Sequence, residues 1–210
     1  MIESASHSLE IPSRVPFMMM GPTVLFPHAM MPLYIFEMHY RSMLQAVLGS
    51  HRMFAVAAVD RESTDSEERQ KPESVGSLGV VRACKQAEDG TYNLILQGLA
   101  RVRLSEVEYK DNYPTASIEN LETVEPEDTG ILKSLQERLT QLIEKVERER
   151  ADVPPEMLTY LHQVDDPEIL LDLAIYTLCP PSSLKQTLLE TLELSDRYRH
   201  FIDVLESSLS

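Results

Sequence analysis

Residues 15–45, VPFMMMGPTVLFPHAMMPLYIFEMHYRSMLQ, form the stretch that decides the fold. The apolar run at 15–20 is typical of a short buried strand, and the Gly-Pro pair after it marks a turn. Residues 33–36 return to strand-like sequence. From Glu37 onward, apolar side chains recur at helical spacing until a glycine follows, which predicts an amphipathic helix. The stretch therefore predicts a strand, an apolar loop, a second strand and a helix.

Two prolines, Pro27 and Pro32, bracket the middle of this stretch. Each proline removes a backbone donor and pushes its predecessor to extended geometry, so we expect a loop here rather than a helix or a central strand. Loops run mostly over the surface. Eight of the ten methionines lie between Met18 and Met53, and methionine suits both irregular cores and surfaces that accept varied apolar partners. We therefore predict an exposed apolar patch that binds substrates, with core packing as the alternative. The candidate residues are Phe26, Met30, Met31 and Leu33.

The chain up to residue 121 continues with strand-like runs separated by turns. The expected strands cover residues 53–59, 75–84, 92–96, 101–107 and 113–121. An Asp-Gly pair at 89–90 predicts a tight hairpin, because this pair readily takes positive φ. Gln97-Gly98 is expected to end the strand at 92–96 before the next one begins at 101. A bulge is expected after Leu104. The charged, serine-rich residues 60–74 are expected to form a solvated loop.

The composition changes near residue 124, beyond which every long segment favours helices. Apolar residues recur at intervals of three and four between 132 and 146, and Asp166 followed by Pro167 is typical of a helix start. We expect at least four helices. The predicted organisation is a flexible arm at 1–9, a β-rich unit at 10–124 and a helical bundle at 125–210.

Several separate motifs resemble, in the expected order, the Lon protease amino-terminal (substrate-binding) domain family. They are Phe26-Pro27, Met31-Pro32-Leu33, Phe36-Glu37, Tyr40-Arg41, Val75 to Gly79, Asp89 to Tyr92, Gln97 to Arg101, Pro154 to Glu156, Asp165 to Pro167, and Lys185-Gln186 with Leu188 to Glu190. The resemblance spans residues 15–208. It implies an α+β fold in which a β-rich PUA-like barrel precedes a helical bundle. It also implies a stand-alone binding domain without the ATPase and peptidase modules of that family.

The charge of the chain limits its partners. A formal net charge of −15 argues against nucleic acid, which needs a basic footprint, and against anionic membrane surfaces. No run approaches the length of a membrane-spanning helix, and the polar, acidic start has no signal-peptide pattern, so we expect a cytoplasmic protein. Cys84 and Cys179 lie far apart without metal-ligand spacing, and we expect reduced, buried thiols.

The sequence contains no recognisable catalytic motif. A phosphate-binding loop, a G-x-S-x-G nucleophile turn and an H-E-x-x-H zinc motif are all absent. We therefore predict no enzyme activity, no cofactor and no metal. The predicted function is binding of unfolded or partly unfolded proteins or peptides through their exposed hydrophobic segments. The alternatives are an unrecognised hydrolase or peptidase, and an adaptor that docks onto a separate protease.

Overall fold

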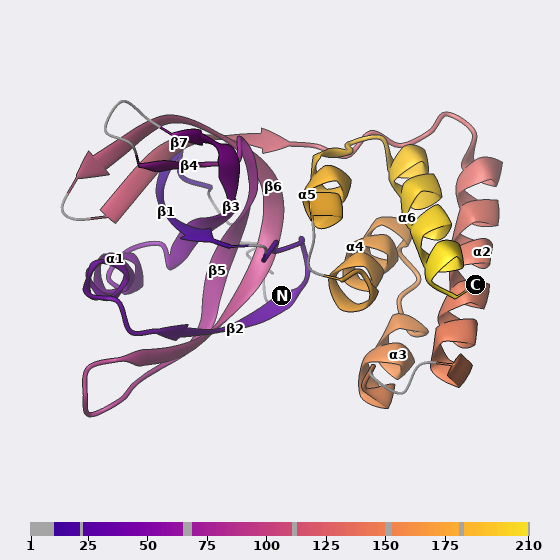
Figure 1. Cartoon of the computed structure of the whole chain (residues 1–210), viewed down its shortest axis with the longest axis horizontal. Coiled ribbons are helices and arrows are strands. Elements are labelled where there is room, and N and C mark those ends of the chain that lie inside the picture. Colours follow the sequence, from indigo (N-terminus) through magenta and orange to yellow (C-terminus); the bar gives the residue numbers. More distant parts are fainter. Residues whose placement is uncertain are drawn as a thin grey trace, which may run out of the picture.

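A computed structural model describes residues 11–21, 23–64, 69–110, 113–149, 153–180 and 183–209. Strands and one helix make up the first half and helices make up the second, which confirms the predicted α+β fold (Figure 1). The first half contains β1 (Arg14–Met20), β2 (Met30–Ile35), α1 (Met38–Leu48), β3 (Met53–Thr64), β4 (Gln70–Pro72), β5 (Val75–Gln86), β6 (Tyr92–Lys110) and β7 (Tyr113–Leu121). The second half contains α2 (Thr129–Glu149), α3 (Pro155–Leu161), α4 (Pro167–Leu178), α5 (Ser183–Glu190) and α6 (Leu194–Ser208).

Five strands close into a barrel-like ring. The hydrogen-bonded order is β1-β7-β6-β5-β3, and β1 also pairs in parallel with β3, with Phe17 opposite Ala55. The other pairings between the described strands are antiparallel. One core fills this ring, and its buried members are Val15, Phe17, Met53, Ala55, Ala57, Leu78, Val80, Val102, Leu104 and Ala116. Strand β2 lies outside the ring order and pairs with β6.

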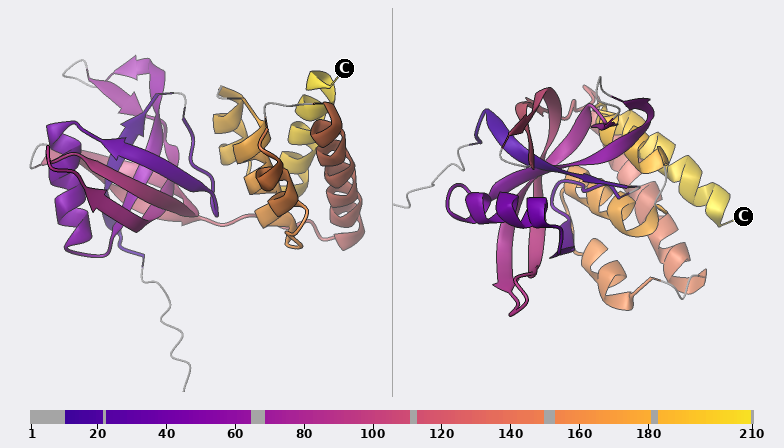
Figure 2. Two further views of the ribbon diagram at one scale, coloured as in Figure 1. Left: turned by 90° about the horizontal axis from the view of Figure 1, so that it is seen from below. Right: turned by 60° about the vertical axis from the view of Figure 1, so that its left-hand side comes forward.

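A second core joins the strand half to the helical half, which lie side by side in both views of Figure 2. It contains Phe26 and Leu96 from the strand half together with Leu171 and Phe201 from the helices. Helix α4 is the most buried helix, as its nearly continuous apolar sequence predicts. The Asp166 carboxylate accepts a hydrogen bond from the Ile169 N–H at 2.9 Å, which confirms the predicted start of this helix.

Some expectations from the sequence differ from the structure or lie outside it. Residues 92–110 form one strand rather than two, because register shifts against β5 let the chain pass Gln97-Gly98 without leaving the sheet. Much of the expected loop at 60–74 continues β3 to Thr64 and forms β4, while residues 65–68 lie outside the described part. The expected arm at 1–9 also lies outside the described residues.

Strand β2 begins at Met30, three residues earlier than expected, and includes Pro32. A proline is compatible with a strand when its nitrogen faces away from the paired neighbour. In the described part of the chain, β2 pairs with β6 alone, so Pro32 sits on an edge strand. The expectation that the proline-bracketed segment stays a loop is therefore wrong for its last three residues.

Gly98 controls how closely the segment before β2 approaches β6. A Cβ atom at this position would lie 2.1 Å from the carbonyl oxygen of Phe26 and 2.9 Å from its carbonyl carbon. Because backbone atoms cannot move aside as a flexible side chain can, we expect Gly98→Ala to lower the free energy of unfolding by about 1–3 kcal/mol. Chemical denaturation measures this loss.

Gly21→Ala is the matched control, since a Cβ atom at Gly21 has nothing within 4 Å. This variant should keep its stability or gain up to about 1 kcal/mol. Equal stability losses in the two variants would show that the close contact at Gly98 is not the cause of the loss.

Candidate functional site

The outward face of β2 and the residues after it form an exposed apolar strip. Burial alternates strictly along the strand, so even-numbered residues point outward and odd-numbered residues point into the core. Exposed fractions are 52% for Met30, 55% for Tyr34, 59% for Phe36 and 79% for Met38, and Pro32 is also exposed. The Tyr34 and Phe36 rings stack with centroids 5.9 Å apart. We call Met30, Pro32, Tyr34, Phe36 and Met38 the β2 strip.

Only one of the four candidate patch residues predicted from the sequence belongs to this strip. Met30 is exposed, whereas Phe26, Met31 and Leu33 are buried in the second core. The exposure expected for these three residues is therefore wrong. Alternation along 30–35 places Met30 on the opposite face of the strand from Met31 and Leu33, but it does not show which of the two apolar faces is buried.

The segment before β2 is buried because its backbone polar groups find partners inside the protein. The Ser77 hydroxyl donates to the Leu25 carbonyl at 2.6 Å, and the Ala29 N–H donates to the Phe26 carbonyl at 3.2 Å. Gly98 accepts from the His28 N–H and donates to the Ala29 carbonyl, both at 2.9 Å. Since these bonds replace water, the loop can leave the surface despite its prolines.

A pocket of about 400 Å³ lies beside the strip on the outer face of the sheet. Its lining comes from β2, β5 and β6 and consists of Pro32, Leu33, Tyr34, Ala83, Cys84, Lys85, Asn93, Leu94 and Ile95. Burial raises the pKa of the Cys84 thiol, and nearby Arg52 lowers it less. The raised pKa keeps this cysteine a neutral thiol at pH 7, which does not favour a nucleophilic role. The pocket is thus a mainly apolar hollow that extends the surface offered by the β2 strip.

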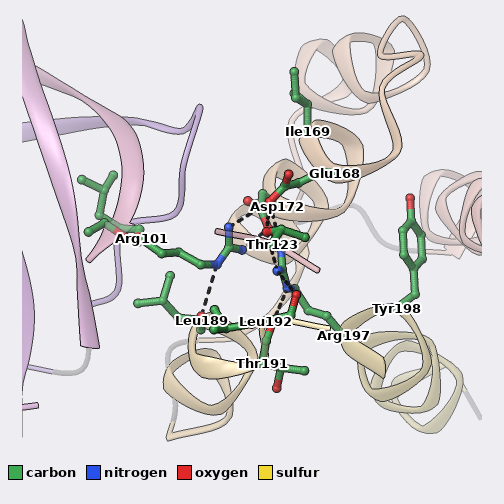
Figure 3. A network of polar contacts seen from close by, with 12 residues as sticks. Arg101, Thr123, Glu168, Ile169, Asp172, Leu189, Thr191, Leu192, Arg197 and Tyr198 are labelled. Carbon is green, nitrogen blue, oxygen red and sulfur yellow. Dashed lines mark hydrogen bonds and ion pairs between the residues drawn. The ribbon is translucent and has the colours of Figure 1, made fainter. Parts of the chain in front are cut away.

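A buried polar network lies where the two halves meet (Figure 3). The Arg101 guanidinium donates to Asp172 Oδ1 at 2.5 Å and to Glu168 Oε1 at 3.3 Å. From α6, Arg197 donates to Asp172 Oδ1 at 2.9 Å and to Thr123 Oγ1 at 3.0 Å, and the Thr123 hydroxyl donates to Glu168. Burial and the neighbouring Arg101 lower the pKa of Arg197, while the two carboxylates oppose this change.

The network links β6 to the helices by hydrogen bonds. Two arginines face two carboxylates, so the charges within it balance. Arg101 also donates from Nε to the Leu189 carbonyl at 3.2 Å, and Arg197 donates from Nε to the Thr191 carbonyl at 2.8 Å. Because most of these side chains are enclosed and hydrogen-bonded to one another, the arrangement positions elements rather than offering a surface to a ligand. Sequence reasoning missed it, because apolar and charged residues alternate at the start of the expected strand 101–107, which favours a half-exposed strand with Arg101 on its polar face.

Two further features are absent from the described part of the chain. No group of three or more His, Cys, Asp or Glu side chains is arranged to hold a metal ion there. None of the helices described combines the length and the hydropathy needed to cross a bilayer.

Comparison with solved structures assigns the fold to a known class. The N-terminal domain of Mycobacterium avium complex Lon protease matches with a TM-score of 0.71 and 19% identity, covering 92% of this chain and 98% of that one. A Lon N-terminal domain protein from Xanthomonas campestris matches with a TM-score of 0.61 and 17% identity, covering 91% and 98%. The protein therefore has the α+β fold of Lon amino-terminal domains. The model of the ATP-dependent protease La (LON) substrate-binding domain matches residues 14–207, and the chain belongs to that family.

The curated relatives are much longer than this chain. Lon protease of Escherichia coli (strain K12) is 24% identical over 197 residues, which cover 93% of this chain and 25% of the relative. Lon protease of Trichlorobacter lovleyi is 28% identical over 194 residues, covering 89% and 23%. The chain thus spans about a quarter of the length of the curated relatives it matches.

Proposed function

We propose that this protein is a non-catalytic module that binds unfolded or partly unfolded proteins through their exposed hydrophobic segments. The observation that carries the proposal is the β2 strip, where apolar side chains stay largely exposed next to a mainly apolar pocket. Contiguous exposed apolar patches on soluble proteins mark sites of interaction with other molecules. Membership in a substrate-binding domain family supports a protein as the ligand.

The composition of the β2 strip suits varied apolar partners. Met30 and Met38 are flexible, polarisable side chains that adapt to different shapes. Tyr34 and Phe36 offer large apolar surfaces with little rotamer freedom to lose, and aromatic residues are common energetic centres of interfaces. The strip therefore combines two rigid anchors with two adaptable contacts.

The test is a triple variant, Met30→Ser with Tyr34→Ser and Phe36→Ser. Loss of an anchor residue commonly reduces the free energy of binding by more than about 1 kcal/mol. We therefore expect binding of unfolded casein to weaken at least about tenfold. Fluorescence anisotropy with labelled casein measures the affinity. The melting temperature should stay nearly unchanged, because all three side chains are at least half exposed.

A double variant on α3, Met157→Ser with Tyr160→Ser, serves as the control. These side chains are also exposed, at 39% and 54%, but lie in the helical half. Casein binding should be unaffected by this change. If the α3 variant loses affinity and the triple variant does not, the binding surface is not the β2 strip.

A further inference from the structure

The edge of β2 opposite β6 is unpaired in the part of the chain that the structure describes. The strand runs from the helical half toward α1 (Figure 1), and its register against β6 places Met30 opposite Gln97 and Tyr34 opposite Asn93. An edge strand presents backbone N–H and C=O groups that can pair with another chain.

Three observations show which backbone groups face this edge. The Ala29 carbonyl accepts from Gly98 of β6 at 2.9 Å, so residue 29 points toward β6. The Met30 carbonyl accepts from the Tyr176 hydroxyl at 3.4 Å, from a helix rather than from β6. Pro32 has no N–H to offer to β6. Because successive residues of an antiparallel strand alternate in direction, residues 30, 32 and 34 present their backbone groups to the open edge.

We propose that an extended segment of the bound polypeptide adds to β2 as a further strand at this edge. The inference rests on the proposed function and specifies how the ligand binds. Tyr34 supplies one donor and one acceptor, Pro32 supplies an acceptor, and Met30 supplies a donor. Main-chain hydrogen bonds give such pairing its affinity for any sequence. Every second side chain of the added strand lies next to the β2 strip, which selects apolar residues at alternate positions.

Pro32 makes a foreign chain a better occupant than a second copy of this protein. If two β2 edges paired with each other, both strands would bring a proline and both would lack that donor. An incoming segment without proline has an N–H at every residue and loses only the one bond that Pro32 cannot donate. Tyr176 already contacts the Met30 carbonyl, so the open part of the edge lies toward Tyr34.

The protein-side test compares Tyr34→Pro with Tyr34→Ala. Both variants lose the ring, but only proline also removes the N–H that faces the edge. Since this N–H does not pair with β6, the proline variant should fold, with a melting temperature close to that of the alanine variant. We expect Tyr34→Pro to bind unfolded casein at least about fivefold more weakly than Tyr34→Ala, the effect of losing about 1 kcal/mol. Equal affinities of two folded variants would overturn strand addition.

The ligand-side test needs no variant of the protein. A labelled seven-residue peptide with leucine at alternate positions and threonine between them is N-methylated at one amide at a time. Strand addition predicts a period of two, in which methylation at every second amide weakens binding at least about fivefold and the intervening sites change it little. A uniform response, or none, would overturn the proposal.

These results separate the two proposals. If the triple variant of the β2 strip loses casein but neither backbone test responds, the proposed function stands and strand addition fails. If the triple variant still binds casein, the proposed function itself fails.

Sedimentation equilibrium tests whether a second copy of the protein occupies the edge instead. A concentration-dependent dimer that Tyr34→Pro dissociates would assign the edge to a second copy and overturn the inference.

Discussion

Asp172→Ala is expected to destabilise the protein by about 3–5 kcal/mol, because it leaves two buried arginines without their shared carboxylate. Asp172 Oδ1 accepts from Arg101 at 2.5 Å and from Arg197 at 2.9 Å, and all three side chains are almost fully buried. In a chain of this size each kcal/mol lowers the melting temperature by about 2–4 °C. Differential scanning calorimetry measures the effect directly.

Asp196→Ala provides a matched control for this variant. Asp196 forms an ion pair with Arg199 at 2.7 Å, but both side chains are about half exposed. An exposed ion pair contributes little to stability, so the free energy of unfolding should fall by less than about 1 kcal/mol. Similar losses of stability in Asp172→Ala and Asp196→Ala would mean that the contribution of the network to stability does not depend on its burial.

Met31→Asp is expected to destabilise the protein severely. Only 3% of the Met31 side chain is exposed, and it lies in the core shared with the helices. An unpaired carboxylate at this position should cost more than about 4 kcal/mol, so the variant should melt early or fail to accumulate in soluble form. Urea denaturation, or the soluble yield, reports the loss.

The neighbouring change Met30→Asp should behave in the opposite way. Met30 lies on the outward face of β2 and is 52% exposed, so stability should change by no more than about 0.5 kcal/mol. Binding of unfolded casein should weaken, because a carboxylate interrupts the β2 strip. A Met30→Asp variant that unfolds as easily as Met31→Asp would contradict the alternation on which the site rests.

Local signals explain why several elements could be predicted from the sequence. The Asp-Gly hairpin forms between β5 and β6 with Gly90 at φ 81°. The bulge expected after Leu104 occurs between Ser105 and Glu108 with Glu106 at φ 47°. The start of α4 at Asp166-Pro167 depends on one capping hydrogen bond. Each feature depends on residues close together in the chain, so its pattern is readable without knowledge of the fold.

The candidate site could be predicted only in part. The sequence predicts an apolar surface near Met30, but residues 30–36 are apolar on both faces of the strand, so periodicity could not show which face is buried. That choice depends on the pairing of β2 with β6. The binding role of the β2 strip stays a prediction.

The sequence by itself determined the order of a β-rich and a helical half, the helix starts, the hairpin and the family motifs, because these depend on local composition and spacing. Tertiary structure decided what becomes of side chains whose partners are distant in the chain. Arg101 has the pattern of a half-exposed strand residue, yet it is buried because Asp172, 71 residues further along, neutralises it. Phe26 is likewise buried because Ser77, Gly98 and their neighbours take up the polar groups of its loop. Burial of a charge or of a loop needs compensating partners, and only the folded chain brings those partners together.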